Sequence, residues 1–516
     1  MKPLFSYCFL LATLTLSACD AKDGGGGWSE GGEWGGGGEG GAADVDRDGF
    51  DATTDCDDED AAVNPGATES PYDGVDNDCD AATPDDDLDG DGYGVSGPFD
   101  VDCDDDDASV SPGAPELCDG RDNNCDGDLE DEEGAASFED SSGGWTDVST
   151  GLAGTPAAPG LVTLSEDGVL HLCPGEWVGS LRIEAEVSVL GAGIEHTALS
   201  GGGVATVIDV APGASASLSG LTIRGGEASV VSVREDNDYL AGGGVFCEAA
   251  ALTLQEVTLV GNSASLGGAL FAVGCEVTLS DTSFDRNTAV VEGGGIYLEE
   301  SSANISGSSL SNHTAGESGG GIYAYLYSDL SILDTAFYNN TADDGGGVYV
   351  LGSDVSISDS SFSNNTAGRA GGGLAAFYSG NPSISATSFG SNSAEDGGGG
   401  VYIYGSDASI SGSSFSNNTS GESGGGIYAY LGSPGITAAD GGRSFTSKDS
   451  YLSVSDTTFE HNTAVSNGGG MFLDGGSADI RTSDFLNNNP DDTYFWGDSD
   501  FWGLNASFAC STGGCD

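Results

Sequence analysis

The sequence predicts an all-β protein, in which a right-handed, single-stranded parallel β-helix follows a small, acidic, disulfide-bearing domain. Two observations predict this fold class. A repeat of about 26 residues, built only of short alternating strands and turns, runs through the second half of the chain, and such a period is typical of a solenoid. Acidic residues are concentrated ahead of the repeat, where residues 44–133 contain 34 Asp and Glu but only 2 Arg.

The overall composition excludes several classes of partner. The 516 residues include 84 Asp and Glu against 12 Lys and Arg, so the formal net charge is -72. Binding to nucleic acid or docking on anionic lipid requires clustered basic residues, and the composition therefore favours cations as partners. Glycine is abundant, with 88 residues, but it shows no Gly-X-Y period, which excludes collagen.

The N-terminus predicts export. Residues 1–18 have the short apolar stretch and small-residue ending of a signal peptide. Leu16-Ser17-Ala18-Cys19 resembles a bacterial lipobox, which implies that Cys19 is lipidated and becomes the mature N-terminus. The alternative is an ordinary signal with a chance cysteine. We expect a glycine-rich linker over 19–43, membrane contact through the lipid alone, and a cell-envelope location: an outer-membrane lipoprotein facing the surface or the periplasm, or an extracellular protein.

Residues 44–133 contain too few large apolar side chains to fold by hydrophobic burial alone, so we expect disulfides, metal, or both. Asp44, Asp46 and Asp48, then Gly49 and Asp55, follow the spacing of a calcium loop: alternate oxygens converge on one ion and glycine permits the sharp turn. The main-chain carbonyl at position 7, here that of Phe50, completes the predicted ligand set.

Two further loops repeat this spacing. The second lacks an acid at position 12, so Asp102 is expected to close it, whereas the third matches the full twelve-residue pattern. The predicted ligands are Asp87, Asp89, Asp91, Tyr93 and Asp102 in the second loop, and Asp122, Asn124, Asp126, Asp128 and Glu133 in the third. A weaker candidate, Asp76 to Asp80, has alanine in place of the glycine. The alternative for the whole segment is a disordered acidic spacer.

A duplication supports a folded metal-binding unit. Asp55-Cys56-Asp57-Asp58 and Asn64-Pro65-Gly66-Ala67 recur as Asp102-Cys103-Asp104-Asp105 and Ser111-Pro112-Gly113-Ala114. The unit resembles the MopE-type metal-binding repeat of bacterial surface proteins and, more distantly, thrombospondin type 3 and dockerin loops. The family name carries a copper association, but residues 44–133 contain no His, Met or Trp, and carboxylate oxygens suit calcium (Ca2+).

The cysteines fit an exported, disulfide-bonded chain. Without Cys8, in the signal, and the lipidated Cys19, five lie before residue 130 and five after it. Two odd sets require one bridge between the regions, and we expect it to join Cys118 to Cys173.

After a predicted linker at 134–158, residues 159–516 are expected to form the β-helix, with one coil per repeat. Each repeat carries an apolar residue after a triple glycine, an aromatic residue expected to stack inside the core, and an asparagine expected to form a ladder between coils. The glycine-following column is Val245, Leu270, Ile296, Ile322, Val348, Leu374, Val401, Ile427 and Met471. The aromatic column is Phe284, Leu310, Phe337, Phe362, Phe389, Phe415, Phe459 and Phe485. The asparagine column is Asn287, Asn340, Asn365, Asn392, Asn418, Asn462 and Asn488.

Three further expectations concern single columns. His313 interrupts the asparagine column, and we interpret it as a turn residue rather than a catalytic one. Arg369 lies in a column between Asp343 and Glu395 and is expected to form a salt-bridged triad with them. Period two along the strands is expected to expose a file of tyrosines as a platform for a glycan: Tyr297, Tyr323, Tyr349, Tyr402 and Tyr428.

The two repeat motifs resemble the polymorphic outer-membrane protein repeat over residues 240–490, a family that contains surface adhesins. This resemblance implies a non-enzymatic, calcium-stabilised rod for adhesion or for binding glycans or a host or neighbouring cell surface. Two alternatives stay open. A polysaccharide lyase or hydrolase of the pectin-lyase-like fold would require a basic residue beside carboxylates, and a metal-storage or scavenging protein would bind many weak ions.

Overall fold

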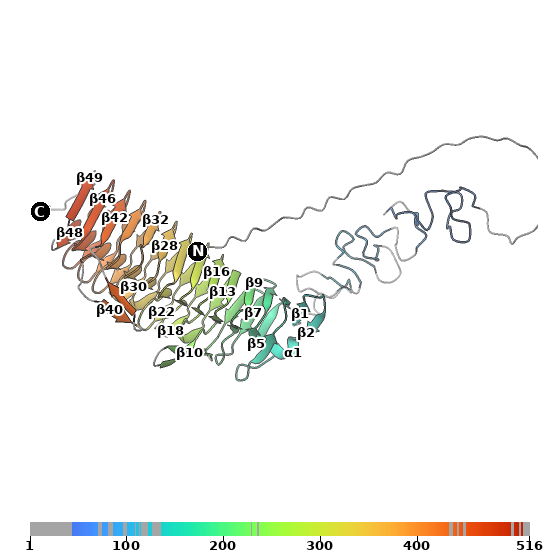
Figure 1. Cartoon of the computed structure of the whole chain (residues 1–516), viewed down its shortest axis with the longest axis horizontal. Coiled ribbons are helices and arrows are strands. Elements are labelled where there is room, and N and C mark those ends of the chain that lie inside the picture. Colours follow the sequence, from blue (N-terminus) through green and yellow to red (C-terminus); the bar gives the residue numbers. More distant parts are fainter. Residues whose placement is uncertain are drawn as a thin grey trace, which may run out of the picture. The chain divides into compact units, whose positions relative to one another are not determined.

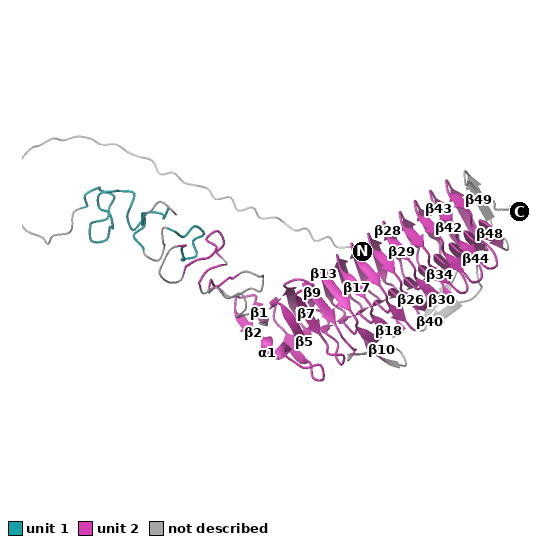
Figure 2. Ribbon diagram, turned by 180° about the vertical axis from the view of Figure 1, so that it is seen from behind, with its two compact units in different colours: residues 1–94 teal, residues 95–516 magenta. Residues whose placement is uncertain are grey.

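The structure is a computed structural model of the whole chain. It describes residues 44–508 apart from 71–74, 81–85, 96–100, 109, 113, 115–121, 126–135, 229, 235–236, 433–436, 441–442, 447–449, 497–499 and 505–506. The chain divides into two compact units, residues 1–94 and 95–516 (Figure 2). Cys19, the predicted signal peptide and the linker at 19–43 lie outside the described residues. No helix among the described residues is long and apolar enough to cross a membrane.

The second unit contains a parallel β-helix, seen as stacked rows of strands in Figure 1. This confirms the predicted fold class. The strands form three faces. Each coil contributes one strand to the face that follows the triple glycines, called the glycine face, one or two strands to a long face and, in most coils, one strand to a short face. The glycine face contains β3 (Gly160–Leu164), β5 (Gly175–Ile183), β8 (Ile208–Val210), β12 (Val245–Glu248), β15 (Leu270–Val273), β19 (Ile296–Glu299), β23 (Ile322–Tyr325), β27 (Val348–Leu351), β31 (Leu374–Phe377), β35 (Val401–Tyr404), β39 (Ile427–Tyr430), β45 (Met471–Asp474) and β48 (Thr493–Trp496).

The long face is bent, so that most coils place two consecutive strands on it. Its parallel strands are β4 (Gly168–Leu172), β6 (Glu186–Gly191), β7 (Thr197–Ser200), β9 (Ser215–Arg224), β13 (Ala251–Val260), β16 (Glu276–Ser280), β17 (Ser283–Asp285), β20 (Ser302–Ser306), β21 (Ser309–Ser311), β24 (Asp329–Leu333), β25 (Ala336–Tyr338), β28 (Val355–Ser358), β29 (Ser361–Ser363), β32 (Ser383–Ser385), β33 (Ser388–Gly390), β36 (Ala408–Ser411), β37 (Ser414–Ser416), β42 (Tyr451–Ser455), β43 (Thr458–Glu460), β46 (Ser477–Arg481), β47 (Asp484–Leu486), β49 (Asp500–Leu504) and β50 (Ser507–Phe508).

The short face follows the asparagine column in each coil. Its parallel strands are β11 (Asn237–Ala241), β14 (Ser263–Leu266), β18 (Thr288–Glu292), β22 (Thr314–Ala315), β26 (Thr341–Asp344), β30 (Thr366–Ala370), β34 (Ser393–Ala394), β38 (Thr419–Ser420) and β44 (Thr463–Ala464). Two antiparallel hairpins extend from the coils: β10 (Val230–Arg234) pairs with β11, and β40 (Thr437–Asp440) pairs with β41 (Arg443–Thr446). The second hairpin lies between Ile427 and Met471, where the step from one coil to the next is 44 residues instead of about 26.

The segment predicted as a linker, 134–158, instead contains β1 (Ala136–Asp140), β2 (Trp145–Asp147) and α1 (Ser149–Leu152). Strand β1 pairs antiparallel with β4 of the first coil. Ala136 and Leu152 are fully buried in the main core. The linker prediction was wrong because these elements are short and lie before the repeat, so they leave no periodic signal in the sequence.

The interior confirms the aromatic and asparagine columns. Phe337, Phe362 and Phe389 are fully buried, with ring centroids 4.5 and 4.8 Å apart. In the asparagine ladder, Asn365 Nδ2 donates to Asn392 Oδ1 at 3.0 Å, and Asn392 Nδ2 donates to Asn418 Oδ1 at 3.0 Å. Asn262 extends the ladder by one coil, since its Nδ2 donates to Asn287 Oδ1 at 3.1 Å.

A second polar ladder was not predicted. At the bend of the long face, the main-chain N–H of Thr282 donates to Ser308 Oγ at 3.1 Å, and that of Thr335 donates to Ser360 Oγ at 3.1 Å. These hydroxyls are buried, so they satisfy main-chain groups that the bend removes from the sheet. Serine and threonine occur at many positions of the repeat, so this column could not be distinguished from its neighbours in the sequence.

Two different structural constraints require glycine in the triplets. The first glycine of a triplet takes a positive φ, 60° at Gly345, which disfavours other residues. The second has no room for a side chain, since a Cβ on Gly346 would lie 2.5 Å from the carbonyl oxygen of Thr366.

Arg369 does not form the predicted triad. Its guanidinium pairs with Asp344 rather than Asp343. A β-bulge between Ala342 and Asp344 shifts the register of β26 against β30 and turns Asp344, only 6% exposed, into the structure. Desolvation raises the pKa of Asp344 even though the charge of Arg369 acts to lower it. Bulges of this kind cannot be read from a regular repeat.

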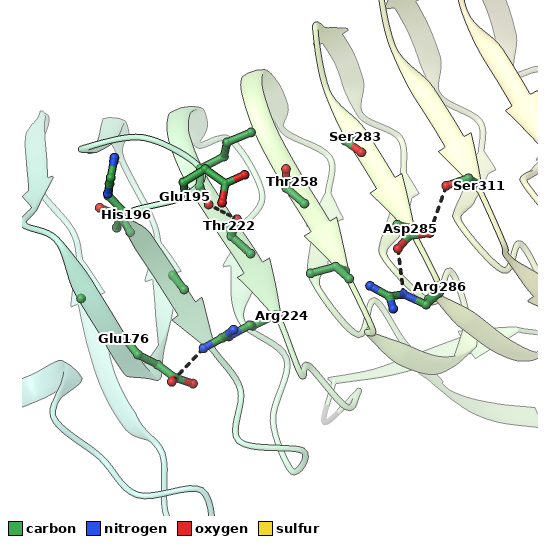
Figure 3. A pocket seen from close by; sticks show the side chains of 15 residues that line it. Glu176, Glu195, His196, Thr222, Arg224, Thr258, Ser283, Asp285, Arg286 and Ser311 are labelled. Atoms are coloured by element: carbon green, nitrogen blue, oxygen red, sulfur yellow. Dashed lines mark hydrogen bonds and ion pairs between the residues drawn. The ribbon is translucent and has the colours of Figure 1, made fainter.

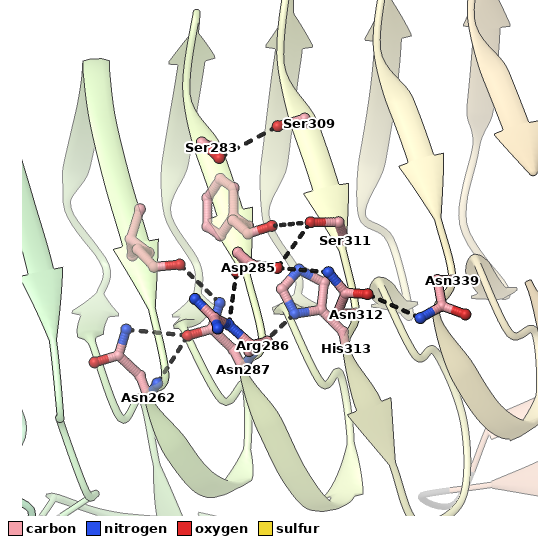
Figure 4. A network of polar contacts seen from close by, with 12 residues as sticks. Asn262, Ser283, Asp285, Arg286, Asn287, Ser309, Ser311, Asn312, His313 and Asn339 are labelled. Carbon is pink, nitrogen blue, oxygen red and sulfur yellow. Dashed lines mark hydrogen bonds and ion pairs between the residues drawn. The ribbon is translucent and has the colours of Figure 1, made fainter. Parts of the chain in front are cut away.

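His313 is fully buried in the asparagine ladder (Figure 4), which confirms its structural interpretation. The ring Nδ1 of His313 accepts a hydrogen bond from the main-chain N–H of Asn287 at 3.1 Å, and the main-chain N–H of His313 donates to Asn340 Oδ1 at 3.0 Å. Among the described residues, the buried Nε2 has no hydrogen-bond partner of standard geometry. Desolvation lowers the pKa of His313 to about 4.

We therefore expect His313 to destabilise the β-helix in acid. Because its pKa is about 6.5 in the unfolded chain and about 4 in the fold, the unfolded state binds the proton first. Stability is then lost as pH falls from 6.5 to 4, by about 3 kcal/mol in total. His313→Asn should remove this component and continue the ladder. Urea denaturation of both proteins at pH 7 and pH 4.5 measures it; equal pH slopes would contradict the expectation.

Candidate metal centre

The first acidic loop has the geometry of an oxygen-ligand site. One oxygen of each aspartate holds the loop backbone: Asp44 Oδ1 accepts from the Arg47 amide at 2.6 Å, Asp46 Oδ1 from that of Asp48 at 3.2 Å, and Asp48 Oδ1 from that of Phe50 at 2.9 Å. Oxygens of Asp44, Asp46 and Asp48 lie within 4.8 Å of one another. Gly49, at φ 109°, makes the turn.

Asp55, predicted to close this loop from its place at position 12, lies beside the loop aspartates. It is 8% exposed, and its carboxylate groups with those of Asp46 and Asp58 within 4.8 Å. The Oδ2 atoms of Asp46, Asp48 and Asp55 are buried and have no hydrogen-bond partner within the described residues. Desolvation and the charges of Asp48, Asp55 and Asp44 raise the pKa of Asp46 against the hydrogen bond from Asp48. Converging, unsatisfied anionic oxygens of this kind fit a divalent cation.

The second loop repeats the first in detail. Asp87 Oδ1 accepts from the Gly90 amide at 2.7 Å and Oδ2 from that of Gly92 at 2.9 Å, while Asp91 Oδ1 accepts from that of Tyr93 at 2.9 Å. Asp89 lies between them and accepts from the Asp91 amide at 3.2 Å. The predicted closing residue, Asp102, belongs to the other compact unit, so its closing role stays a prediction.

The third loop is described only in part. Asp122 and Asn124 are described, whereas Asp126, Asp128 and Glu133 lie outside the described residues. The disulfide of this second copy of the duplicated sequence is equivalent to that of the first copy. Disulfides join Cys56 to Cys79 and Cys103 to Cys125, each with a Cα–Cα distance of 5.6 Å.

The remaining cysteines are partly described. Cys247 is bonded to Cys275 in the next coil. Cys173 is also disulfide-bonded, but its predicted partner, Cys118, lies outside the described residues.

Two acidic residues, Asp58 and Glu69, were missed by the sequence analysis. Asp58 joins the first loop, where its Oδ1 accepts from the Val45 amide at 3.1 Å. Glu69, Asp76 and Asp78 form a separate group, in which Glu69 Oε2 accepts from the Asp78 amide at 3.0 Å. The available signal was the duplication, since Asp58 recurs as Asp105 and Glu69 as Glu116.

A polar groove with a volume of about 650 Å³ lies on the long face of the β-helix (Figure 3). It contains Glu195 and His196 from the turn before β7, and the ion pair of Arg224 Nη2 with Glu176 Oε2 at 2.7 Å. A second groove of about 430 Å³ lies on the same face and is lined by Asn304, Asp329, Ser331, Asp354 and Ser356, among others.

Comparison with known proteins identifies the fold family. The family model of the right-handed β-helix region matches residues 206–389 and, overlapping, 294–512, together more than half of the chain. The chain belongs to the right-handed β-helix family. A second model, the MopE-type metal-binding motif, matches residues 55–85 and 102–131 of this β-helix protein. The loop that begins at Asp44 precedes the first match, which starts at Asp55, the residue predicted to close that loop.

Two solved structures are similar to this β-helix protein. A surface adhesin of Streptococcus pneumoniae, PfbA, is 13% identical, with coverage of 68% of this chain and 83% of that one and a TM-score of 0.29. The periplasmic alginate epimerase AlgG is 11% identical, with coverage of 67% and 84% and a TM-score of 0.32. Similarity at this level carries no argument about function. No curated protein matches the chain.

The predicted exposure of the tyrosine file is wrong. Tyr297 and Tyr323 are 0% and 3% exposed, because they pack with Leu266 and Leu326 in a second apolar cluster outside the main core. Tyr349, Tyr402 and Tyr428 are half-buried. The rings stack on one another, with centroids 5.2 Å apart for Tyr297 and Tyr323 and 5.0 Å for Tyr402 and Tyr428. Desolvation raises the pKa of Tyr428 to about 12.

One coil of this file lacks its ring. Ala375 stands in register between Tyr349 and Tyr402, and Phe377 fills the space, with centroids 5.3 Å from both tyrosines. The file thus acts as a continuous stack that stabilises the glycine face.

Proposed function

We propose that the protein is a non-enzymatic, lipid-anchored rod of the cell envelope, which is stabilised by calcium and binds a repeating glycan surface. The lipobox-like Leu16-Ser17-Ala18-Cys19 supports the anchor. The all-oxygen donor set of the first loop supports calcium, which takes six to eight oxygen ligands in flexible geometry. The disulfides Cys56–Cys79 and Cys103–Cys125 hold the acidic loops in a fixed frame, and this frame supports a structural role for the ion rather than storage.

The observation that carries the binding role is the outer surface of the long face. Serine, threonine and asparagine stand in register in successive coils: Thr278 beside Asn304, Asn304 beside Ser331, and Ser331 beside Ser356. Neighbouring hydroxyls contact each other in places, with Ser309 Oγ 3.3 Å from Ser283 Oγ. Coils repeat at roughly 4.8 Å, so this surface presents donors and acceptors at a regular interval. A regular array suits a repeating polymer better than a single reacting bond.

The test is a binding screen of the full chain against immobilised glycans in 2 mM calcium and in EDTA, with a cleavage assay on alginate and polygalacturonate. We expect retention of at least one glycan and no product from either uronate polymer. Absence of binding to every glycan would contradict the proposal.

A second candidate function is a polysaccharide lyase or hydrolase, favoured by the groove of Figure 3, which Glu195, His196 and Arg224 all line. A lyase would use one of these groups as a base on a uronate. Release of unsaturated, ultraviolet-absorbing uronate that is lost in His196→Ala and Arg224→Gln would establish it.

A further inference from the structure

The groove of Figure 3 has a floor of hydroxyls from three neighbouring coils. Thr222 of β9 stands beside Thr258 of β13, and Thr258 stands beside Ser283 of β17. All three side chains line the groove. A hydroxyl that is not engaged within the protein can both donate and accept, and the spacing between coils, roughly 4.8 Å, is close to the length of one pyranose unit. Thr258 and Ser283 are half-buried and offer one donor–acceptor group per coil along the helix axis. The Thr222 hydroxyl already donates to the carbonyl oxygen of Ile194 at 2.8 Å, which fixes the Ile194 wall beside the floor.

Two arginine–carboxylate pairs flank this floor. Arg224 Nη2 lies 2.7 Å from Glu176 Oε2, with the side chains 43% and 53% exposed. Arg286 Nε lies 2.7 Å from Asp285 Oδ2, with the side chains 71% and 25% exposed. The arginines come from β9 and from the turn after β17. The guanidinium and carboxylate groups of these ion pairs remain partly exposed to solvent, so they keep N–H donors and oxygen acceptors available for sugar hydroxyls.

Asp285 is held in place as an anion. Its Oδ1 accepts from Ser311 Oγ at 3.0 Å and from Asn312 Nδ2 at 2.7 Å. Burial acts to raise the pKa of Asp285, but the hydrogen bonds from Asn312 and Ser311 and the charge of Arg286 lower it overall. A carboxylate fixed in this way serves as a hydrogen-bond acceptor and an anchor for Arg286, not as a proton donor.

The charge of the groove selects among glycans. Arg224 and Arg286 contribute two positive charges, whereas Glu176, Glu195 and Asp285 contribute three negative ones, and the whole chain carries -72. A polyuronate would meet like charge at the site and in the surrounding field, whereas a neutral glycan would not. Ile194, 43% exposed, adds an apolar edge on the wall against which the C–H face of a pyranose can pack.

From this arrangement we infer that the groove formed by β7, β9, β13 and β17 is a binding site for a neutral oligosaccharide, whose chain lies along the helix axis over Thr222, Thr258 and Ser283. This inference rests on the proposed glycan-binding function and assigns it a site and a ligand class. It also gives the arginines of the groove a binding role.

Titration calorimetry of the full chain in 2 mM calcium tests the inference with cellohexaose, mannohexaose and xylohexaose as neutral probes and with alginate hexamer as the acidic probe. We expect at least one neutral probe to bind and the alginate hexamer to bind at least tenfold more weakly. Thr258→Val, which keeps the shape but removes the hydroxyl, should weaken the neutral probe about tenfold. Arg224→Gln should do the same.

The matched control is Thr253→Val, because Thr253 lies on the same strand, β13, faces outward and does not line the groove. It should leave the affinity unchanged. Thermal unfolding of each variant shows whether the fold is retained. Equal affinities for Thr258→Val and Thr253→Val would overturn the assignment of the groove while the proposed function stands. Tighter binding of the alginate hexamer would overturn the ligand class. No binding of any hexamer would overturn the inference, while retention of another glycan in the screen would keep the proposed function.

Discussion

Replacement of Asn365 by alanine is expected to lower the free energy of unfolding of the β-helix by about 3 kcal/mol. Asn365 is fully buried. Its Oδ1 accepts from both the main-chain N–H and the Nδ2 of Asn340, each at 3.0 Å, and its Nδ2 donates to the carbonyl oxygen of Phe337 at 3.1 Å. The substitution leaves the Asn340 amide buried without its acceptor and opens a small cavity between coils.

Thr366→Ala is the matched control, since Thr366 is the next residue and is exposed. It should change the free energy of unfolding by no more than about 0.5 kcal/mol. Urea denaturation followed by circular dichroism compares the two variants in the full chain. Similar losses in both would show that the asparagine ladder contributes no more than an exposed position.

Removal of calcium is expected to unfold the first acidic loop while the β-helix stays folded. Asp46, Asp48 and Asp55 each present a buried oxygen that has no hydrogen-bond partner in the described part of the chain, and these anions repel one another unless a cation is bound. Hydrogen exchange measured by mass spectrometry in 2 mM calcium and in EDTA should show at least about 100-fold faster exchange over residues 44–58 without calcium. Exchange in β19, β23 and β27 should not change, because main-chain and apolar contacts hold these strands.

Two aspartate variants distinguish a predicted calcium ligand from a nearby aspartate that is not predicted to bind the ion. Asp55→Asn removes a ligand charge and should weaken calcium binding to the first loop about 100-fold. Asp51→Asn should change it less than about threefold, because the Asp51 carboxylate accepts from the amide of Thr53 at 3.1 Å and belongs neither to the group of Asp44, Asp46 and Asp48 nor to that of Asp46, Asp55 and Asp58. Equal exchange with and without calcium, with the disulfides intact, would show that the loop does not depend on the ion.

The sequence alone predicted features that depend on a period. The column of Phe362 and the ladder of Asn365 were found by counting residues, because every coil of a solenoid places the same position in the same environment. The first metal loop was found in the same way, since Asp44, Asp46 and Asp48 alternate at a spacing that one ion requires. Local spacing and repetition can therefore be detected in the sequence alone.

The tertiary structure decided what lies beside each column. Tyr297 has the alternation of an exposed residue, yet it is buried because Leu266 and Leu326 cover it. Arg369 meets Asp344 through a bulge that the repeat does not reveal. The groove of Thr222, Thr258 and Ser283 combines strands with a turn, at Ile194, that has no counterpart in the repeat. Such contacts join residues from different coils and corners, and their distances are set by packing in three dimensions rather than by spacing along the chain.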